Sequence, residues 1–370
     1  MTDEETVGAV ARKMVSEDAR WIVDALLGAG KSSEEAAGVV ALLLIGHSSR
    51  IVYEGALAIR SADPYLGVPA VANELKDVHA DVITRSRHAT KLLDDTKKSL
   101  DDLQSEMGGY YARHRQEFTG NSAEWARFME TDLGLYSAAG RLLGATIPLQ
   151  FRMGILANSK VADLGQQLYE ISQEHGSIQA LLSQAAGDSS PITYDADYGP
   201  LGRIEDSDVL TDRYLSSRYD PALPLEAKLL LLMIEGELNV SSVLLPFTEA
   251  RHPDAVFRAR TIILIHALSG IQQVLGRLNG SSQSPSTQAI RAYVSQPRVQ
   301  RLLGPGGPRN IRNRCMHYEI KDKSLALDTS KPMNGIVEAV YPEMSFSDFN
   351  QEVTNTTTEL SDAVRNWTLR

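Results

Sequence analysis

The hydrophobic and polar positions of the chain repeat with the period of an α-helix along most of its length. Val39, Leu42, Leu43 and Gly46 follow the i, i+3, i+4, i+7 spacing that places four residues on one helical face. No stretch of strictly alternating polar and apolar residues, which would predict strands, competes with this pattern. The sequence therefore predicts an all-α protein.

The first half of the chain is expected to contain helices of different character. Residues 70–117 are highly charged, with apolar residues at three-to-four spacing, and predict one long helix or two. Further helices are expected at 122–143, 149–174 and 176–186. The apolar run at 36–46 is too short to span a bilayer, so we expect it to be part of a buried helix.

The composition changes in the middle of the chain. Residues 186–208 are acidic, rich in Gly, Pro and Ser, and lack periodicity, which is typical of a linker or a long loop. The length of 370 residues suggests two domains or three. We therefore predict an N-terminal helical domain at 1–190, an acidic linker at 191–208 and a second helical domain at 209–370, with no role assigned to the first domain.

The second half has the pattern of a bundle of four to five helices. Its helices are expected at 223–245, at 253–278, at 286–303, after Pro308 and at 345–368. Either Ser345 or Ser347 could cap the last helix. Residues 319–344 contain two prolines and a glycine, so they are expected to be irregular or to form a short hairpin.

Charge is distributed unevenly along the chain. The net charge is −10, but residues 255–318 contain nine arginines and no Asp, Glu or Lys, so this window carries +9 and the remainder −19. Such a segment in an otherwise acidic protein predicts a site for a polyanion. The alternative is that these arginines pair with carboxylates elsewhere. Arg312 could then pair with a carboxylate of the first bundle helix, such as Glu235 or Glu237, and His317 could cap the same helix.

The helix expected after Pro308 begins with arginines, although the positive end of a helix dipole favours acidic residues. At 100° per residue its apolar face consists of Ile311, Cys315 and Tyr318, and its opposite face of Arg309, Arg312, Asn313 and His317. A phosphate on this second face would be held by arginine, by free N–H groups of the first turn and by the dipole. A neighbouring histidine could exchange protons near neutral pH. We expect Asn313 to bond His317, four residues later, and to fix its tautomer.

Residues 312–317, Arg-Asn-Arg-Cys-Met-His, resemble the Arg-Asn-x-x-x-His signature of the HEPN superfamily. The following His-Tyr-Glu-Ile, residues 335–349 and the amphipathic end of the chain are also similar to the C-terminal part of bacterial HEPN proteins, so the resemblance covers roughly residues 205–370. It implies a four- to five-helix bundle. For many members it also implies a metal-independent RNA endonuclease, with no cofactor. It says nothing about residues 1–190.

The resemblance implies a role for each residue of the signature. Arg312 would bind the scissile phosphate, Asn313 would support the site and His317 would transfer protons. The implied reaction is attack of the ribose 2′-OH on the adjacent phosphorus, which leaves a 2′,3′-cyclic phosphate and a 5′-OH. Arg309 and Arg314 are not required by the signature, and we expect them to extend the RNA-binding track.

The resemblance also bears on partners. Its members usually form dimers whose two motifs face each other, which implies a homodimer through the C-terminal domain. Met316, expected to be exposed between Arg309 and Arg312, would then be covered by the second subunit. A bacterial stress, toxin or phage-defence setting and a regulatory protein partner are implied by the same analogy. Because inactive relatives exist, the alternative is a non-catalytic helical module that binds RNA or a protein partner.

Other signals point away from competing classes of protein. Residues 28–33, Gly-Ala-Gly-Lys-Ser-Ser, are similar to part of a phosphate-binding loop, but Ala25 occupies the position of its first glycine. We therefore expect these residues to form the end of one helix, followed by the cap of the next at Ser32 or Ser33. Cys315 is the single cysteine, which excludes a disulfide framework and a cysteine-based zinc site. With polar residues at the start of the chain, these features lead us to expect a cytoplasmic protein without membrane attachment.

Overall fold

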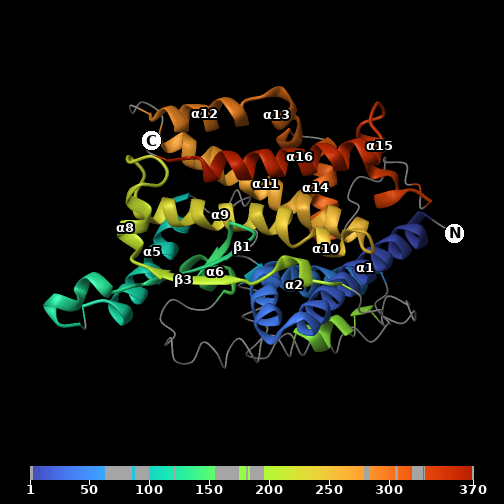
Figure 1. Cartoon of the computed structure of the whole chain (residues 1–370). Helices are drawn as coiled ribbons and strands as arrows, with labels where there is room; N and C mark the ends of the chain where they lie inside the picture. The colour runs from blue at the N-terminus through green and yellow to red at the C-terminus, as the bar shows by residue number, and fades with distance from the viewer. Residues whose placement is uncertain are drawn as a thin grey trace.

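The computed structural model describes residues 3–62, 86–87, 100–120, 122–154, 175–180, 182–183, 196–278, 283–304, 307–318, 328 and 330–368. Helices dominate these residues, and one small sheet lies among them (Figure 1). The prediction of an all-α protein is confirmed.

Two long helices begin the chain. Helix α1 (Asp3–Ser32) and helix α2 (Glu34–Ala62) pack against each other and are joined at Ser33, whose Oγ accepts a hydrogen bond from the N–H of Ala36 at 3.0 Å. The predicted cap at this position is confirmed. Among the described helices, α2 is the one long and apolar enough to cross a membrane, but 72% of that apolar window is buried inside the protein. This burial is what the core helix of a folded domain shows.

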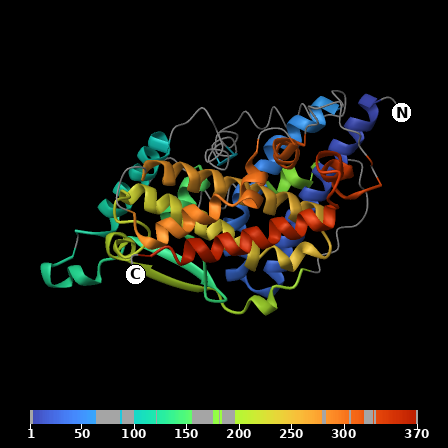
Figure 2. The same cartoon turned by 90° about the horizontal axis from the view of Figure 1, so that it is seen from above.

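The helices of the second half form a bundle around α9 (Leu225–Val243), which packs against α11 (Pro253–Arg277) and α16 (Phe346–Arg365) (Figure 2). Helix α14 (Gly307–His317) follows the expected start near Pro308. Of the two serines proposed as caps of the last helix, Ser345 fills the role, because its Oγ accepts from the N–H of Asp348. Short helices connect these elements, namely α8 (Thr211–Ser216), α10 (Pro246–Glu249) and α15 (Ile336–Val340).

One expected helix of the bundle is divided in two. The prediction of a single helix at 286–303 is wrong, because α12 (Pro285–Val294) ends before α13 (Pro297–Leu303) begins. Proline disfavours helical geometry in the residue before it and lacks the N–H that a helix interior needs. Gln296 accordingly adopts an extended conformation with ψ 139°.

A three-stranded antiparallel sheet replaces one expected helix and part of the expected linker. Strands β1 (Leu133–Ala138), β2 (Arg141–Ala145) and β3 (Glu205–Val209) form it in the order β2-β1-β3. The helix predicted at 122–143 is therefore wrong, and so is the linker interpretation of the residues in β3. Ala139 and Gly140 have positive φ, which closes a two-residue turn between β1 and β2.

The sheet is fixed by contacts that no local pattern shows. Helix α9 packs against β2, and a Cβ atom at Gly236 would lie 2.8 Å from the carbonyl oxygen of Leu143. Only glycine permits this approach of the helix to the strand. Asn239 of the same helix donates a hydrogen bond to the carbonyl oxygen of Leu142 at 2.8 Å.

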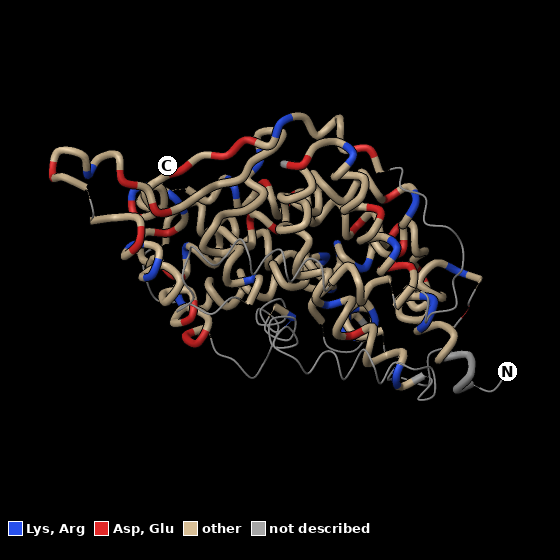
Figure 3. The backbone as a smooth tube through the Cα atoms, turned by 90° about the horizontal axis from the view of Figure 1, so that it is seen from below, with Lys and Arg blue, Asp and Glu red and all other residues tan. Residues whose placement is uncertain are grey.

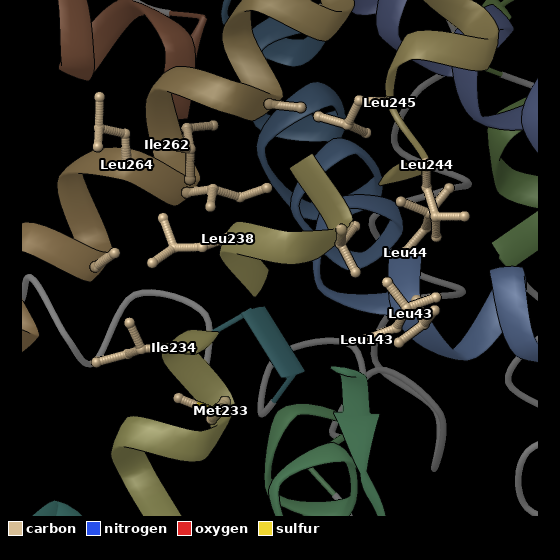
Figure 4. Packing of buried hydrophobic residues seen from close by; sticks show 14 of the residues in the cluster. Leu43, Leu44, Leu143, Met233, Ile234, Leu238, Leu244, Leu245, Ile262 and Leu264 are labelled. Carbon is tan, nitrogen blue, oxygen red and sulfur yellow. The ribbon is translucent and has the colours of Figure 1, made fainter. Parts of the chain in front are cut away.

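One cluster of buried apolar side chains includes residues from both halves of the chain. In Figure 4, Leu43 and Leu44 of α2 and Leu143 of β2 lie beside the bundle helices that carry Leu238 and Ile262. Burial of apolar surface at roughly 25 cal/mol per Å² is the main force that holds these elements together. The two halves thus share a core across the predicted linker, and their division into two domains stays a prediction.

The remaining expectations fall only partly on described residues. Of the long charged stretch, the structure describes residues 86–87 and α5 (Leu100–Phe118), and the rest lies outside the described residues. Helix α6 (Thr146–Arg152) begins before the helix expected at 149–174, most of which also lies outside them. Residues 175–180 and 182–183 are helical, as expected for 176–186. The described part of 319–344 contains a short 3-10 turn and α15, which agrees with the irregular structure expected there.

Burial of histidine side chains makes the fold sensitive to acid. Burial lowers the pKa of His175 to about 4 and that of His266 to about 3, and burial also lowers the pKa of His47. Below about pH 6.5 the unfolded chain binds protons that the folded chain does not, so stability is full above that pH and falls as pH decreases toward 4. We expect urea midpoints to fall over this range, and to fall less steeply for His175→Gln than for the unaltered chain.

Candidate functional site

The candidate site lies on α14, which packs against α11 on one side and α2 on another. Ile311, Cys315 and Tyr318 are buried, so the predicted apolar face is confirmed. The opposite side is partly open: Arg309 is exposed, and Arg312, Asn313 and His317 are half-buried. The first half of the chain thus contacts the motif, which the sequence did not indicate.

His317 contacts a carboxylate from the first half of the chain. Its Nδ1 lies 2.9 Å from Oε2 of Glu54 on α2, and the other carboxylate oxygen of Glu54 accepts from Nε of Arg87 at 2.7 Å. The Arg87 guanidinium also forms an ion pair with Glu54. The carboxylate of Glu54 on α2 therefore contacts the guanidinium of Arg87 on one side and the imidazole of His317 on α14 on the other.

This contact determines which nitrogen of His317 is free. Burial raises the pKa of Glu54, but the hydrogen bond to His317 and the charge of Arg87 outweigh it and hold that pKa below its usual value. An ionised carboxylate only accepts hydrogen bonds, so Nδ1 of His317 must donate. In the neutral imidazole Nε2 is then unprotonated and able to accept a proton.

Asn313 does not have the role we expected for it. Its Oδ1 accepts a hydrogen bond from Nη1 of Arg312 at 2.8 Å, whereas His317 is oriented by Glu54. The prediction that Asn313 fixes the histidine tautomer is wrong in this conformation, because a charged acceptor from a neighbouring helix binds the imidazole instead. Asn313 holds the arginine side chain, which is still a supporting role within the signature.

The C-terminal end of α14 is anchored by a buried ion cluster centred on Asp18 of α1. Its carboxylate accepts from Arg50 at 2.6 Å, from Arg258 at 2.6 Å and from the hydroxyl of Tyr318 at 2.7 Å. Burial raises the pKa of Asp18, but the charges of Arg258 and Arg50 outweigh it and keep the carboxyl below its usual value. Arg50 also donates to the carbonyl oxygen of Cys315 at 3.0 Å.

Tyr318 adopts a strained conformation directly after the motif. Its φ of +56° is uncommon for a residue with a large side chain. The buried hydroxyl bond to Asp18 and the cation–π contact with Arg50 hold it in place. The chain thus leaves α14 immediately after His317, and the same cluster that fixes Tyr318 positions the histidine.

Arg314 lies on the buried side of α14. It is 1% exposed, and burial lowers its pKa to about 10. None of its three guanidinium nitrogens has a hydrogen-bond partner in the part of the chain that the structure describes. The expectation that Arg314 extends an RNA track is therefore wrong for this conformation, because two helical positions after Arg312 the side chain points to the opposite side. Arg309 is exposed and remains available for that role.

Met316 is also buried, contrary to expectation. It is 0% exposed within a single chain, although the spacing of 100° per residue places it between Arg309 and Arg312 on the helix. Helix α2 packs against α14, so the first half of the chain covers part of the face that we assigned to a second subunit. The argument for a dimer from an exposed Met316 is therefore wrong.

Most arginines of the acid-free window pair with carboxylates elsewhere in the chain. Five of the nine have such partners: Arg258 with Asp18 and Glu17, Arg260 with Glu249, Arg277 with Asp101, Arg298 with Glu359, and Arg301 with Glu352. In Figure 3, basic and acidic positions are interspersed along the backbone rather than separated onto two sides. The alternative of internal pairing is thus confirmed for these five.

For the motif itself, the specific partners named in that alternative are wrong. Glu235 contacts Arg218 and Tyr219, and Glu237 lies 2.9 Å from Nε of Arg152. Among the described residues, no group of three or more His, Cys, Asp or Glu side chains could hold a metal ion. The described site thus consists of Arg312, Asn313 and His317 with Glu54 and Arg87.

One sequence signal could have identified Glu54. In the otherwise apolar α2, His47, Arg50 and Glu54 recur at i, i+3 and i+7, which places three titratable residues on one helical face. All three are buried. Charged residues are rarely buried without partners, so such a stripe predicts contacts with other charged groups. Asp18 and Arg87 do not belong to a comparable stripe of titratable residues, so nothing in the sequence indicated their roles.

Comparison with models of protein families, with curated proteins and with solved structures found no match to this chain. The resemblance to the HEPN superfamily therefore rests on the motif and its place in a helical bundle.

Proposed function

We propose that the protein is a metal-independent endoribonuclease of HEPN type, with Arg312, Asn313 and His317 as its site. The observation that supports this best is the Glu54–His317 pair. A histidine oriented by a carboxylate, with its other nitrogen unprotonated, is the arrangement of a general base. Arg312 beside it can bind a phosphate through two parallel hydrogen bonds.

In the proposed reaction, Nε2 of His317 takes the proton of a ribose 2′-OH as the oxygen attacks the adjacent phosphorus. The bond from phosphorus to the 5′-oxygen breaks, that oxygen takes a proton from water, and the hydroxide left behind takes the proton from Nε2 of His317. The products are a 2′,3′-cyclic phosphate and a 5′-OH. Glu54 stabilises the imidazolium that forms, while Arg312 offsets charge that develops on the phosphate. Arg87 is buried and acts on substrate only through Glu54.

The alternative function is a non-catalytic module that binds RNA or a protein partner. The internal pairing of five arginines favours it, because a smaller unpaired charge offers less attraction to a polyanion. Such a module would need Arg309 and Arg312 but not His317. The setting in bacterial stress or phage defence, the cytoplasmic location and a homodimer remain parts of the proposal that rest on the resemblance.

Cleavage of single-stranded RNA in the presence of EDTA tests the proposed function. Because His317 and Arg312 provide the base and the phosphate ligand, we expect full activity with the chelator and products that end in a 2′,3′-cyclic phosphate. Mass spectrometry of the fragments distinguishes this end from the 3′-OH or the linear phosphate of other mechanisms. Activity that disappears with EDTA and returns with Mg²⁺ or Mn²⁺ would contradict the proposal and place the chemistry elsewhere.

A further inference from the structure

One carboxylate joins His317 to a buried arginine. Oε1 of Glu54 accepts from Nε of Arg87 at 2.7 Å and also contacts Nη2 of the same guanidinium. The other oxygen of Glu54, Oε2, lies 2.9 Å from Nδ1 of His317. The two oxygens of this carboxylate are therefore divided between a permanent cation and an imidazole that can gain or lose a proton.

Burial differs among these three groups. The side chains of Arg87 and Glu54 are 3% and 7% exposed, whereas that of His317 is 21% exposed. Water and salt therefore screen the Arg87–Glu54 pair little, and the buried guanidinium is not placed to bind a phosphate on the open side of α14. Arg87 can influence a reaction at His317 only through the carboxylate or through its electric field.

The charge of Arg87 acts beyond its own ion pair. Burial lowers the pKa of Arg312, and the charge of Arg87 lowers it further. Burial, followed by the charges of Arg87 and Arg152, lowers the pKa of His266 to about 3. The electric field of Arg87 therefore includes Arg312, the phosphate ligand of the proposed site.

The other charged groups near α14 are engaged elsewhere. Helices α2, α11, α13 and α15 pack against α14, and His266 of α11 is neutral because of its low pKa. The remaining charged side chains of these helices have their own partners or lie at an exposed helix end: Arg50 and Arg258 contact Asp18, Arg260 contacts Glu249, Arg277 contacts Asp101, Arg298 contacts Glu359, Arg301 contacts Glu352, Asp254 accepts from the N–H of Met333, Glu338 accepts from the N–H of Phe346, and Glu34 and Arg60 are exposed at the ends of α2. Among the described groups, Glu54 and Arg87, with Arg312 on the same helix, thus dominate the charge around the imidazole.

We propose that Arg87 is a positioning residue that keeps His317 able to accept a proton, because it binds one oxygen of Glu54 and offsets part of its negative charge. A carboxylate beside an imidazole favours the imidazolium, which cannot act as a base. A buried carboxylate without a second partner would favour it most. With Arg87 on Oε1, Glu54 still orients Nδ1 but attracts the proton less. The consequence for cleavage rests on the proposed function, whereas the protonation of His317 does not.

The same ion pair could serve the fold alone, since a buried arginine needs a partner. The two explanations differ in what happens when the cation is removed. If the pair is only structural, stability falls and the protonation of His317 does not change. If Arg87 acts as proposed, His317 binds its proton more tightly, and its titration moves to higher pH.

Titration of the histidine ring signals in the full chain tests the proposal. With an isotope label at Cε1 of the histidines, NMR follows each imidazole against pH, and the signal lost in His317→Gln identifies this residue. Arg87→Gln keeps a hydrogen-bond donor for Oε1 but removes the charge, so the midpoint of the His317 titration should rise by roughly one pH unit. Arg87→Met should raise it at least as far, and Arg87→Lys, which retains the charge, should leave it close to that of the unaltered chain.

Arg152 provides the matched control. It pairs with Glu237, and the two side chains are 5% and 7% exposed, so this pair is as buried as that of Arg87 and Glu54. Arg152→Gln should lower the melting temperature to a similar extent and leave the midpoint of His317 in place. A midpoint that stays unchanged in both Arg87→Gln and Arg87→Met, or that moves equally in Arg152→Gln, would overturn the proposal whether or not the chain cleaves RNA.

The pH dependence of RNA cleavage separates this proposal from the proposed function. If His317 is the base, the acid limb of the rate profile should move with its titration, so Arg87→Gln should lower the rate about 10-fold at pH values below the midpoint of the unaltered chain. Glu54→Gln should move the limb in the opposite direction, because it removes the negative charge. A His317 titration that moves while the limb of the rate profile stays in place would support the role of Arg87 and refute that of His317 as the base.

Discussion

Replacing His317 by alanine is expected to lower RNA cleavage by roughly 100- to 10,000-fold, the usual contribution of a general base. RNA affinity should change by no more than a few-fold, because Arg309 and Arg312 remain to bind phosphate. Single-turnover cleavage gives the rate, and binding of a 2′-deoxy analogue, which cannot be cleaved by this route, gives the affinity. Cleavage equal to that of the unaltered chain would favour the non-catalytic module.

Two further variants serve as controls, one in a histidine–carboxylate pair outside the motif and one in the carboxylate that contacts His317. His252 is half-buried and lies 3.1 Å from Asp24, so His252→Ala removes a comparable pair outside the motif and should leave cleavage unchanged. Glu54→Gln keeps the size of the side chain but removes the charge that stabilises the imidazolium. We expect it to lower the rate and to change its dependence on pH, with RNA affinity unaltered. If Glu54 had only a structural role, Glu54→Gln would lower the melting temperature but would not change how the cleavage rate depends on pH.

The second large effect is expected on stability. Asp18→Asn should lower the free energy of unfolding by about 3–5 kcal/mol, because it leaves Arg50 and Arg258 buried without their shared carboxylate. Both arginines and Asp18 are fully buried, so water cannot replace the lost partner. Urea denaturation followed by circular dichroism measures the change.

Two variants make that result specific. Glu359→Gln removes the partner of Arg298 in an exposed pair and should change stability by less than about 1 kcal/mol. Arg314→Met replaces a buried guanidinium that has no hydrogen-bond partner in the described structure, so it should be neutral or stabilising. If Asp18→Asn were no more destabilising than Glu359→Gln, the cluster would not be what anchors α14.

Elements set by local pattern could be predicted from the sequence. Helices α9, α11 and α16 follow their apolar periodicity, and Ser33 and Ser345 cap helices because a serine before a helical run accepts a backbone N–H. The apolar face of α14 also followed from its spacing. The failures at 122–143 and in the expected linker both involve short strands, whose stability depends on pairing. Strand β1 pairs with β2 across a two-residue turn and also with β3, which lies far along the chain.

The candidate site shows the same division between the local and the distant. The sequence by itself determined that Arg312, Asn313 and His317 lie on one side of a helix, because helical geometry depends only on spacing. Only the tertiary structure decided that Glu54, 263 positions earlier, orients His317, and that Met316 is buried. Charged side chains attract each other through space, so from the sequence alone any arginine could pair with any carboxylate. Packing of α2 against α14 selects among them, because burial makes an unpaired charge costly and a paired one stable.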